Sequence, residues 1–318
     1  MSAHLAFSLN ATMPVFLLMV LGVILRRVGI VDAAFASRLN TFVFCVALPV
    51  LLFRDISSVD LAKEWNARFV LDCALITLAS IVFACAASAF VKSRATRGEF
   101  IQGAYRSSVA MLGVALMQSI YGSSQAAAMM IIGVVPLYNA AAVVVLAVCA
   151  EDLQTKRKGT RAMFFGIVRD IVTNPIIVGI AAGLLWTAFR LPMPEATGKA
   201  VDAVAGLATP LGLVAMGAMA DFRRMRKEAG SSVGASVIKL FGLCVVLLPV
   251  CVALGYRGEE LMALLFMLGS ATTVSSFVMA RNMGYEGVVS SAIVMITTLG
   301  SVFSLTVWIY LLRCFGLA

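Results

Sequence analysis

The chain has 318 residues, of which 61% are hydrophobic and 13% are charged. A soluble globular protein cannot bury that much apolar surface, so the composition indicates a membrane protein that crosses the bilayer several times. The net charge of +9 does not indicate a nucleic-acid partner, because basic residues accumulate in the cytoplasmic links of membrane proteins.

Along the chain, ten segments have the apolar character of membrane-spanning helices, each of which needs about 20 such residues. They are residues 10–28, 36–57, 67–91, 103–121, 125–149, 166–189, 203–221, 232–255, 259–282 and 287–312. The links between them are short, so we expect no soluble domain. The sequence therefore predicts an all-α polytopic membrane protein with ten transmembrane helices.

The distribution of lysine and arginine predicts the orientation. The links after the first, third, fifth, seventh and ninth segments carry 16 of these residues, against 7 on the opposite side. By the positive-inside rule the richer set faces the cytoplasm, so we expect both termini outside and the short basic loop 151–165 inside. The N-terminal stretch MSAHLAFSLNATMP has no lysine or arginine, so the first segment is predicted to be retained and not cleaved as a signal peptide.

No motif for catalysis or for a cofactor is present. The only histidine is His4, no phosphate-binding loop occurs, and the seven cysteines lie almost entirely within apolar segments without a CxxC spacing. We therefore expect no enzyme activity, no metal site and no cofactor, and interpret the cysteines as small apolar residues.

The two halves of the chain resemble each other. RSSVAMLGVALMQSIYG (106–122), for example, aligns with LGSATTVSSFVMARNMG (268–284). The pattern predicts two five-helix repeats, residues 1–150 and 166–318, joined by the loop 151–165. Because five is an odd number, the second repeat is inverted in the membrane, and inverted repeats in secondary transporters place the substrate site near the bilayer midplane.

The stretch 269–284 contains five hydroxyl side chains within an apolar segment, and its counterpart in the first half contains Ser107, Ser108 and Gly113. A helix that unwinds inside a bilayer frees backbone N–H and C=O groups, which nearby hydroxyls or a polar ligand must satisfy. We expect both helices to be interrupted there and to form the substrate site. The alternative is that the hydroxyls only hold neighbouring helices together.

At these positions the chain resembles the auxin efflux carrier family, which includes bacterial carriers of this length and the plant auxin transporters. The most specific match is RLNTFVFCVALPVLLFRDIS (38–57). NARFVLD (66–72), VVPLYNAAAVVVL (134–146), TNPIIVGIAAGLL (173–185) and ATPLGLVAMGAMAD (208–221) also resemble family motifs. The resemblance covers nearly the whole chain.

This resemblance implies a bile-acid-sodium-symporter-like fold, a 5+5 inverted repeat in which the broken fourth and ninth helices cross at the centre. It also implies elevator-type alternating access, small organic anions as substrates, and homodimers formed through the second and seventh helices. The auxin carriers have a proline at each crossing, whereas this chain has Ala115 and Ser276. Its substrate preference is therefore not carried over from auxin.

The candidate site residues follow from the resemblance and the repeat. Asn139 falls where the auxin carriers place a substrate-contacting polar residue, and its neutral amide can donate to a carboxylate; Ser301 is its approximate counterpart in the second repeat. The expected substrate-binding set is Asn139, Ser107, Ser108, Gly113, Ala115, Thr272, Thr273, Ser275, Ser276 and Ser301.

Four charged residues within or near the segments receive separate interpretations. Asp72 lies several residues inside the third segment and is the candidate proton-coupling residue, with a solvated interfacial carboxylate as the alternative. Lys239 is expected to snorkel to the membrane interface, with attraction of an anion as the alternative. Arg106 and Arg281 are expected to anchor the cytoplasmic ends of their helices, with the drawing in of anions as the alternative.

We predict a secondary transporter of a small organic anion, a carboxylate such as malonate or an auxin-like acid, in a bacterial inner membrane. Its partners are this anion and the lipid bilayer. Uniport, proton coupling through Asp72 and sodium coupling all stay open at this stage. The alternatives to carboxylate transport are symport of another small solute and a membrane sensor that keeps the fold without transporting.

Overall fold

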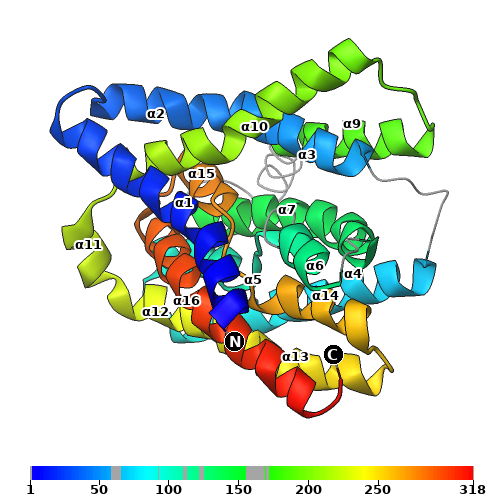
Figure 1. Cartoon of the computed structure of the whole chain (residues 1–318). Helices are drawn as coiled ribbons and strands as arrows, with labels where there is room; N and C mark the ends of the chain where they lie inside the picture. Colours follow the sequence, from blue (N-terminus) through cyan, green and yellow to red (C-terminus); the bar gives the residue numbers. More distant parts are fainter. Residues whose placement is uncertain are drawn as a thin grey trace.

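The computed structural model describes residues 2–58, 66–91, 93–109, 113–121, 125–154, 169 and 172–317 (Figure 1). Every regular element within these ranges is helical, as predicted. The α-helices are α1 (Ser2–Arg27), α2 (Ala33–Phe42), α3 (Leu48–Ser57), α4 (Ala67–Ala87), α5 (Arg94–Tyr105), α6 (Val114–Tyr121), α7 (Gln125–Gln154), α9 (Pro175–Ala188), α10 (Glu195–Ala218), α11 (Phe222–Lys227), α12 (Ala229–Val237), α13 (Leu243–Ala253), α14 (Gly258–Gly269), α15 (Ser275–Asn282) and α16 (Val288–Cys314). The π-helical turns η1 (Val43–Ala47) and η4 (Ile238–Gly242) and the 3-10 turn η2 (Ser88–Phe90) continue neighbouring helices.

Six helices of the described chain are long and apolar enough to span a membrane. They are Ala33–Ser57, Ala67–Phe90, Gln125–Ala150, Glu195–Ala218, Ala229–Ala253 and Val288–Cys314. Each corresponds to one of the ten predicted segments. Residues 155–168, which hold most of the predicted basic loop and the start of the sixth segment, lie outside the described residues, and the shorter apolar helix α9 follows them.

Two predicted segments are each split into two short helices. The segment 259–282 becomes α14 and α15, with residues 270–274 unwound between them. The segment 103–121 becomes α5 and α6, and its predicted start is wrong because α5 begins nine residues earlier, at Arg94. The predicted segment left out the first part of α5 because its residues are polar. Glu99 lies in that part and is nevertheless buried, since its carboxylate accepts hydrogen bonds from Gly287 N at 3.2 Å and Ser290 N at 2.7 Å.

The helices form two groups in the view of Figure 1. The first group consists of α1, α2, α3, α9 and α10, in which α1 packs along α10 and α3 packs along α9. The second group consists of α4–α7 and α12–α16, and the two broken helices belong to it. The groups touch mainly where α15 and α16 meet α1, α2 and α10, and where α7 meets α3 and α9.

Glycines allow the closest contacts within the first group. A Cβ atom added at Gly217 of α10 would lie 2.0 Å from Met19 O of α1, and one at Gly179 of α9 would lie 2.5 Å from Pro49 O of α3. No side chain fits at such distances from a backbone atom, so the two helix pairs pack backbone to backbone. Small residues at helix contacts are typical of membrane proteins, in which close packing replaces much of the hydrophobic driving force.

We predict that Gly179→Ala destabilises the protein, because the methyl group forces α9 away from α3. Overpacking of this kind costs about 1–3 kcal/mol. The matched control is Gly206→Ala in α10, where an added Cβ meets nothing within 4 Å and helix propensity improves. Thermal unfolding in detergent should show a lower Tm for the first variant and an equal or higher Tm for the second. Equal Tm values for both would contradict the packing role.

Candidate functional site

The two interrupted helices cross where they unwind. The backbone leaves the α-helical conformation at Arg106 (φ −70°, ψ 144°) and at Ser270 (φ −75°, ψ 166°). Ser108 N then donates to Ala271 O at 2.9 Å, which joins one unwound segment directly to the other. The expected interruption of both helices is confirmed, and it occurs without the prolines that the auxin carriers have at these positions.

Hydroxyl groups satisfy several backbone atoms that the interruptions leave free. Thr272 Oγ1 donates to Gly103 O at 2.8 Å, in the last turn of α5, and Thr272 N donates to Thr297 Oγ1 at 3.0 Å. Ser276 Oγ donates to Thr273 O at 2.8 Å. Gln102 Nε2 donates to Ser276 O at 2.9 Å and so ties α5 to α15. The polar residues of the two segments therefore replace the helical hydrogen bonds that an uninterrupted span would have made.

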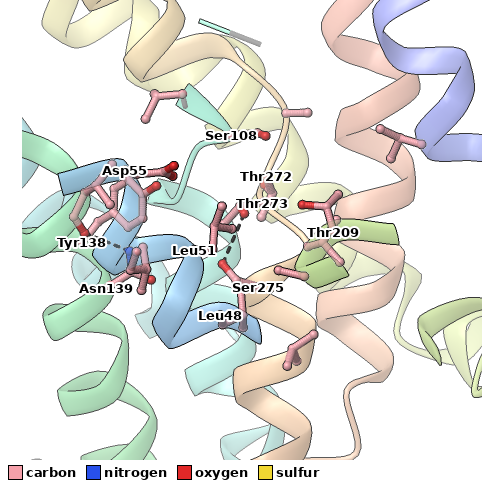
Figure 2. A pocket seen from close by; sticks show the side chains of 18 of the residues that line it. Leu48, Leu51, Asp55, Ser108, Tyr138, Asn139, Thr209, Thr272, Thr273 and Ser275 are labelled. Carbon is pink, nitrogen blue, oxygen red and sulfur yellow. Dashed lines mark hydrogen bonds between the residues drawn. The ribbon is translucent and has the colours of Figure 1, made fainter. Parts of the chain in front are cut away.

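A cavity of about 110 Å³ lies beside the crossing, between the two helix groups (Figure 2). Five of the predicted site residues line it. They are Ser108, Asn139, Thr272, Thr273 and Ser275. Figure 2 shows Thr273 and Ser275 joined by a hydrogen bond, whose oxygen atoms are 3.2 Å apart. From the other helix group, Leu48, Leu51 and Leu52 of α3 supply an apolar surface, and Thr209 of α10 also lines the cavity.

The other predicted site residues lie outside this cavity. Ser107 and Ser276 are buried and bond to neighbouring groups, and Gly113 packs against Met130 and Phe266. Ser301 Oγ donates to Thr298 O within α16, and Thr298, one turn earlier, lines the cavity instead. Ala115 lies in the first turn of α6, and its side chain is outside the described part of the structure.

Arg106 does not anchor a helix end at the membrane surface, so that expectation is wrong. The side chain is fully buried, because α5 begins earlier than predicted and brings its C-terminal end to the crossing. Arg106 Nη2 donates to Asn139 Oδ1 and to Ser275 Oγ, both at 2.6 Å, and Nη1 donates to Gln102 Oε1 at 3.3 Å. The guanidinium carbon lies 5.4 Å from the centre of the Tyr138 ring. The cation therefore lies directly behind three residues that line the cavity.

The charge of Arg106 has no acidic partner among the described residues. The ion pairs in this part of the chain involve other arginines and lysines, and Arg106 Nε has no hydrogen-bond acceptor there. Ser275 is the first residue of α15, and the N-terminal end of a helix carries a partial positive charge. Arg106 itself caps the C-terminal end of α5, where the helix dipole is negative and favours its charge. The desolvation of a buried cation that has no acidic partner is still costly unless an anion is close.

Arg106 also sets which atoms of its neighbours can serve a ligand. Asn139 Oδ1 accepts from Arg106, and one amide hydrogen goes to Val135 O at 2.8 Å. The second amide hydrogen is left for the cavity that Asn139 lines. Ser275 Oγ likewise accepts from Arg106, which leaves its hydroxyl hydrogen to donate to Thr273 or to a ligand. The wall therefore presents hydrogen-bond donors backed by a cation, which is the chemistry that binds a carboxylate.

Lys239 is also fully buried, so the expectation that it snorkels to the interface is wrong. Its ammonium group donates to Ser107 Oγ, to Met267 O at 3.2 Å and to Leu268 O at 2.5 Å. Both carbonyls belong to the last turn of α14, where the helix dipole is negative. The charge of Lys239 is thus stabilised by these carbonyls and by the negative end of α14.

Five polar residues that line the cavity were missed by the sequence analysis, namely Arg54, Asp55, Tyr138, Thr209 and Thr298. Asp55 lines it and forms an ion pair with Arg54, with Arg54 Nη2 2.6 Å from Asp55 Oδ1, and Figure 2 shows Asp55 on the same side as Tyr138. Arg54 and Asp55 lie within the motif that carries the family resemblance, and Tyr138 precedes Asn139, so proximity to those features was the available signal. The ion pair limits the repulsion that the carboxylate of Asp55 exerts on an anion.

Asp72 lies away from the cavity. It stands in the second turn of α4, where its Oδ2 accepts a hydrogen bond from Tyr256 OH at 2.5 Å and lies 3.8 Å from Arg68 Nε. Its proton-coupling role stays a prediction. Arg281 lies in the last turn of α15, and its Nη1 donates to Glu286 O at 3.0 Å. Among the described residues, no group of three or more His, Cys, Asp and Glu side chains is placed to hold a metal ion.

Comparison with known proteins adds two findings. Residues 7–309 match the model of a family described as "Membrane transport protein". A protein of Rhizobium meliloti (strain 1021) named "Putative malonate transporter" is 27% identical over 313 residues, which cover 95% of this chain and 94% of that protein.

We predict that Thr272→Val destabilises the crossing, because valine keeps the shape of threonine but leaves Gly103 O without its donor. An unsatisfied buried carbonyl costs about 1–3 kcal/mol. The control is Thr306→Val in α16, where Thr306 Oγ1 bonds to Val302 O within a continuous helix at 2.7 Å, so that carbonyl keeps its backbone partner. A clearly lower Tm for Thr272→Val than for Thr306→Val is expected, and the reverse order would contradict this role of Thr272.

Proposed function

Because the chain belongs to the auxin efflux carrier family of membrane transport proteins, we propose that it is a secondary transporter of a small organic anion, a carboxylate of the size of malonate. It is a multi-pass membrane protein, and the membrane we propose is a bacterial inner membrane. The observation that carries the substrate class is Arg106, a fully buried cation without an acidic partner among the described residues, held directly behind the cavity wall.

An anion in the cavity would balance this charge. The desolvation of a buried cation costs several kcal/mol unless a counter-charge compensates it. A carboxylate that accepts from Asn139 and Ser275 would bring its negative charge next to the guanidinium and to the positive end of α15. Release of the anion would again leave the buried guanidinium without a counter-charge. The binding energy of the anion is therefore available to stabilise the anion-bound conformation.

The size of the cavity supports a short aliphatic acid. At about 110 Å³ it is smaller than the pockets of drug-sized ligands, which are about 300–1,000 Å³. An aromatic auxin-like acid needs more room than a malonate-like acid. The name of the Rhizobium meliloti relative supports the same choice.

The place of the cavity supports alternating access of the elevator type. Its walls come from both helix groups, with α1, α3 and α10 on one side and the crossing, α7 and α16 on the other. If the group that contains the crossing slides against the other, the anion travels with Arg106, Asn139 and Ser275. We interpret α1, α2, α3, α9 and α10 as the static group, within a ten-helix 5+5 inverted repeat of the bile-acid-sodium-symporter-like fold.

We predict that Arg106→Gln lowers malonate affinity by roughly 10- to 150-fold, because hydrogen bonds that involve a charged group contribute about 1.5–3 kcal/mol. The control is Arg223→Gln in α11, which changes the same charge on the exposed surface. Uptake of labelled malonate into proteoliposomes, measured over a concentration series, gives both affinities. Unchanged affinity in folded Arg106→Gln protein would refute the proposed role of this cation.

We predict that Asn139→Ala weakens malonate binding by roughly 5- to 150-fold, because the variant loses a donor worth about 1–3 kcal/mol. Ser276→Ala should cost less, since Ser276 Oγ bonds to Thr273 O and does not line the cavity. The same uptake assay compares the two variants. A larger loss in Ser276→Ala than in Asn139→Ala would mean that the substrate lies elsewhere at the crossing.

A further inference from the structure

The second buried cation of the crossing, Lys239, lies within a shell of oxygen atoms. Its three acceptors are Ser107 Oγ, from the unwound segment after α5, and the carbonyl oxygens of Met267 and Leu268, from the last turn of α14. Freed carbonyls and the C-terminal ends of half-helices are the groups with which secondary transporters coordinate a coupling cation such as Na⁺. Here an ammonium group of the chain itself occupies that place.

The hydrogen bonds match the charged form of Lys239. Ser107 Oγ donates its own hydrogen to Met267 O, so it can only accept from Lys239. The two carbonyl oxygens can only accept as well. An ammonium group has three donors and no acceptor, whereas a neutral amine has two donors and a lone pair. Three acceptors around one nitrogen therefore match the cation.

Lys239 lies at an irregular point of its helix. The residue lies within the π-helical turn η4 (Ile238–Gly242), and such turns inside α-helices are frequent at functional sites. Among the described residues, no carboxylate forms an ion pair with Lys239. The negative end of the α14 dipole and the Ser107 hydroxyl stabilise its charge instead.

We propose that the Lys239 ammonium is a tethered replacement for a monovalent cation at the crossing, so that the protein binds and carries its substrate without Na⁺. The oxygen cluster is then a latent site for a small monovalent cation, which opens when the ammonium is removed. A cation attached to the chain cannot leave on the far side of the membrane, so a sodium gradient cannot drive this carrier. The transport part of this proposal rests on the proposed function, whereas the cation site does not.

The test uses the purified full-length protein and two variants, one of which empties the space of the Lys239 side chain and one of which fills it. Lys239→Ala removes the ammonium and leaves room for an ion, whereas Lys239→Met removes the ammonium but fills the space with an uncharged chain of similar length. Each is compared with the unchanged protein and with Lys227→Ala, an exposed lysine of α11. Thermal unfolding is measured in rising NaCl against equal concentrations of choline chloride, whose cation is too large for the cluster.

We expect NaCl to raise the Tm of Lys239→Ala in a saturable way, because an ion that binds only the folded state stabilises it by mass action. The unchanged protein, Lys239→Met and Lys227→Ala should respond equally to the two salts. Recovery of folded Lys239→Ala only when it is purified in NaCl would support the site equally well. Equal stability of Lys239→Ala in both salts, a failure to fold in either, or a sodium response of the unchanged protein would overturn the proposal.

Malonate uptake into proteoliposomes separates this proposal from the function on which it draws. Uptake by the unchanged protein should be the same in sodium and in choline. Uptake by Lys239→Ala should fall by roughly tenfold or more in choline, the loss expected when one charged hydrogen-bonding group is missing, and should recover in sodium. If no variant takes up malonate but sodium still stabilises Lys239→Ala, the substrate assignment fails and the cation site stands. Sodium-dependent uptake by the unchanged protein would overturn the tethered-cation role.

Discussion

Two interrupted helices meet inside an apolar protein, and their freed backbone groups must find partners there. Each polar group left bare in hydrocarbon costs several kcal/mol. The contact between Ser108 N and Ala271 O and the hydroxyls of Thr272 and Thr297 satisfy some of these groups. The requirement explains why polar residues gather at the crossing, and it also places them at one wall of a cavity.

The crossing holds two buried cations, Lys239 and Arg106, whose hydrogen bonds go to different kinds of acceptor. Lys239 faces the C-terminal end of α14, whose carbonyls accept its hydrogens and stabilise its charge. Arg106 caps the C-terminal end of α5 and donates to the neutral oxygens of Asn139 and Ser275, and it has no acidic partner among the described residues. Lys239 therefore ties the segment after α5 to the end of α14, whereas Arg106 is the cation to which we assign the substrate in the proposed function.

The part of the cavity lining that comes from α3 is largely apolar, unlike the polar lining at the crossing. Leu48, Leu51 and Leu52 present aliphatic side chains, while the carboxylate of Asp55 is paired with Arg54. In the proposed transport, an apolar surface that makes few directional contacts would slide past a bound anion at little cost, whereas the polar residues at the crossing would hold the anion by hydrogen bonds. The asymmetry suits a carrier in which one helix group moves with its substrate and the other stays fixed.

Sequence alone determined the membrane class, the position of most helices and the interruption in residues 269–284, because apolar composition and local polar clusters are properties of contiguous residues. It also placed Asn139, Ser108, Thr272, Thr273 and Ser275 in the candidate site. Only the tertiary structure decided that Arg106, Lys239 and Glu99 are buried, and which groups they bond to. Hydropathy treats a charged residue as a marker of the membrane surface, but these three find their partners on helices far away in the chain. Those partners decide whether a buried charge is stabilised or left for a ligand, and they exist only after the helices have packed.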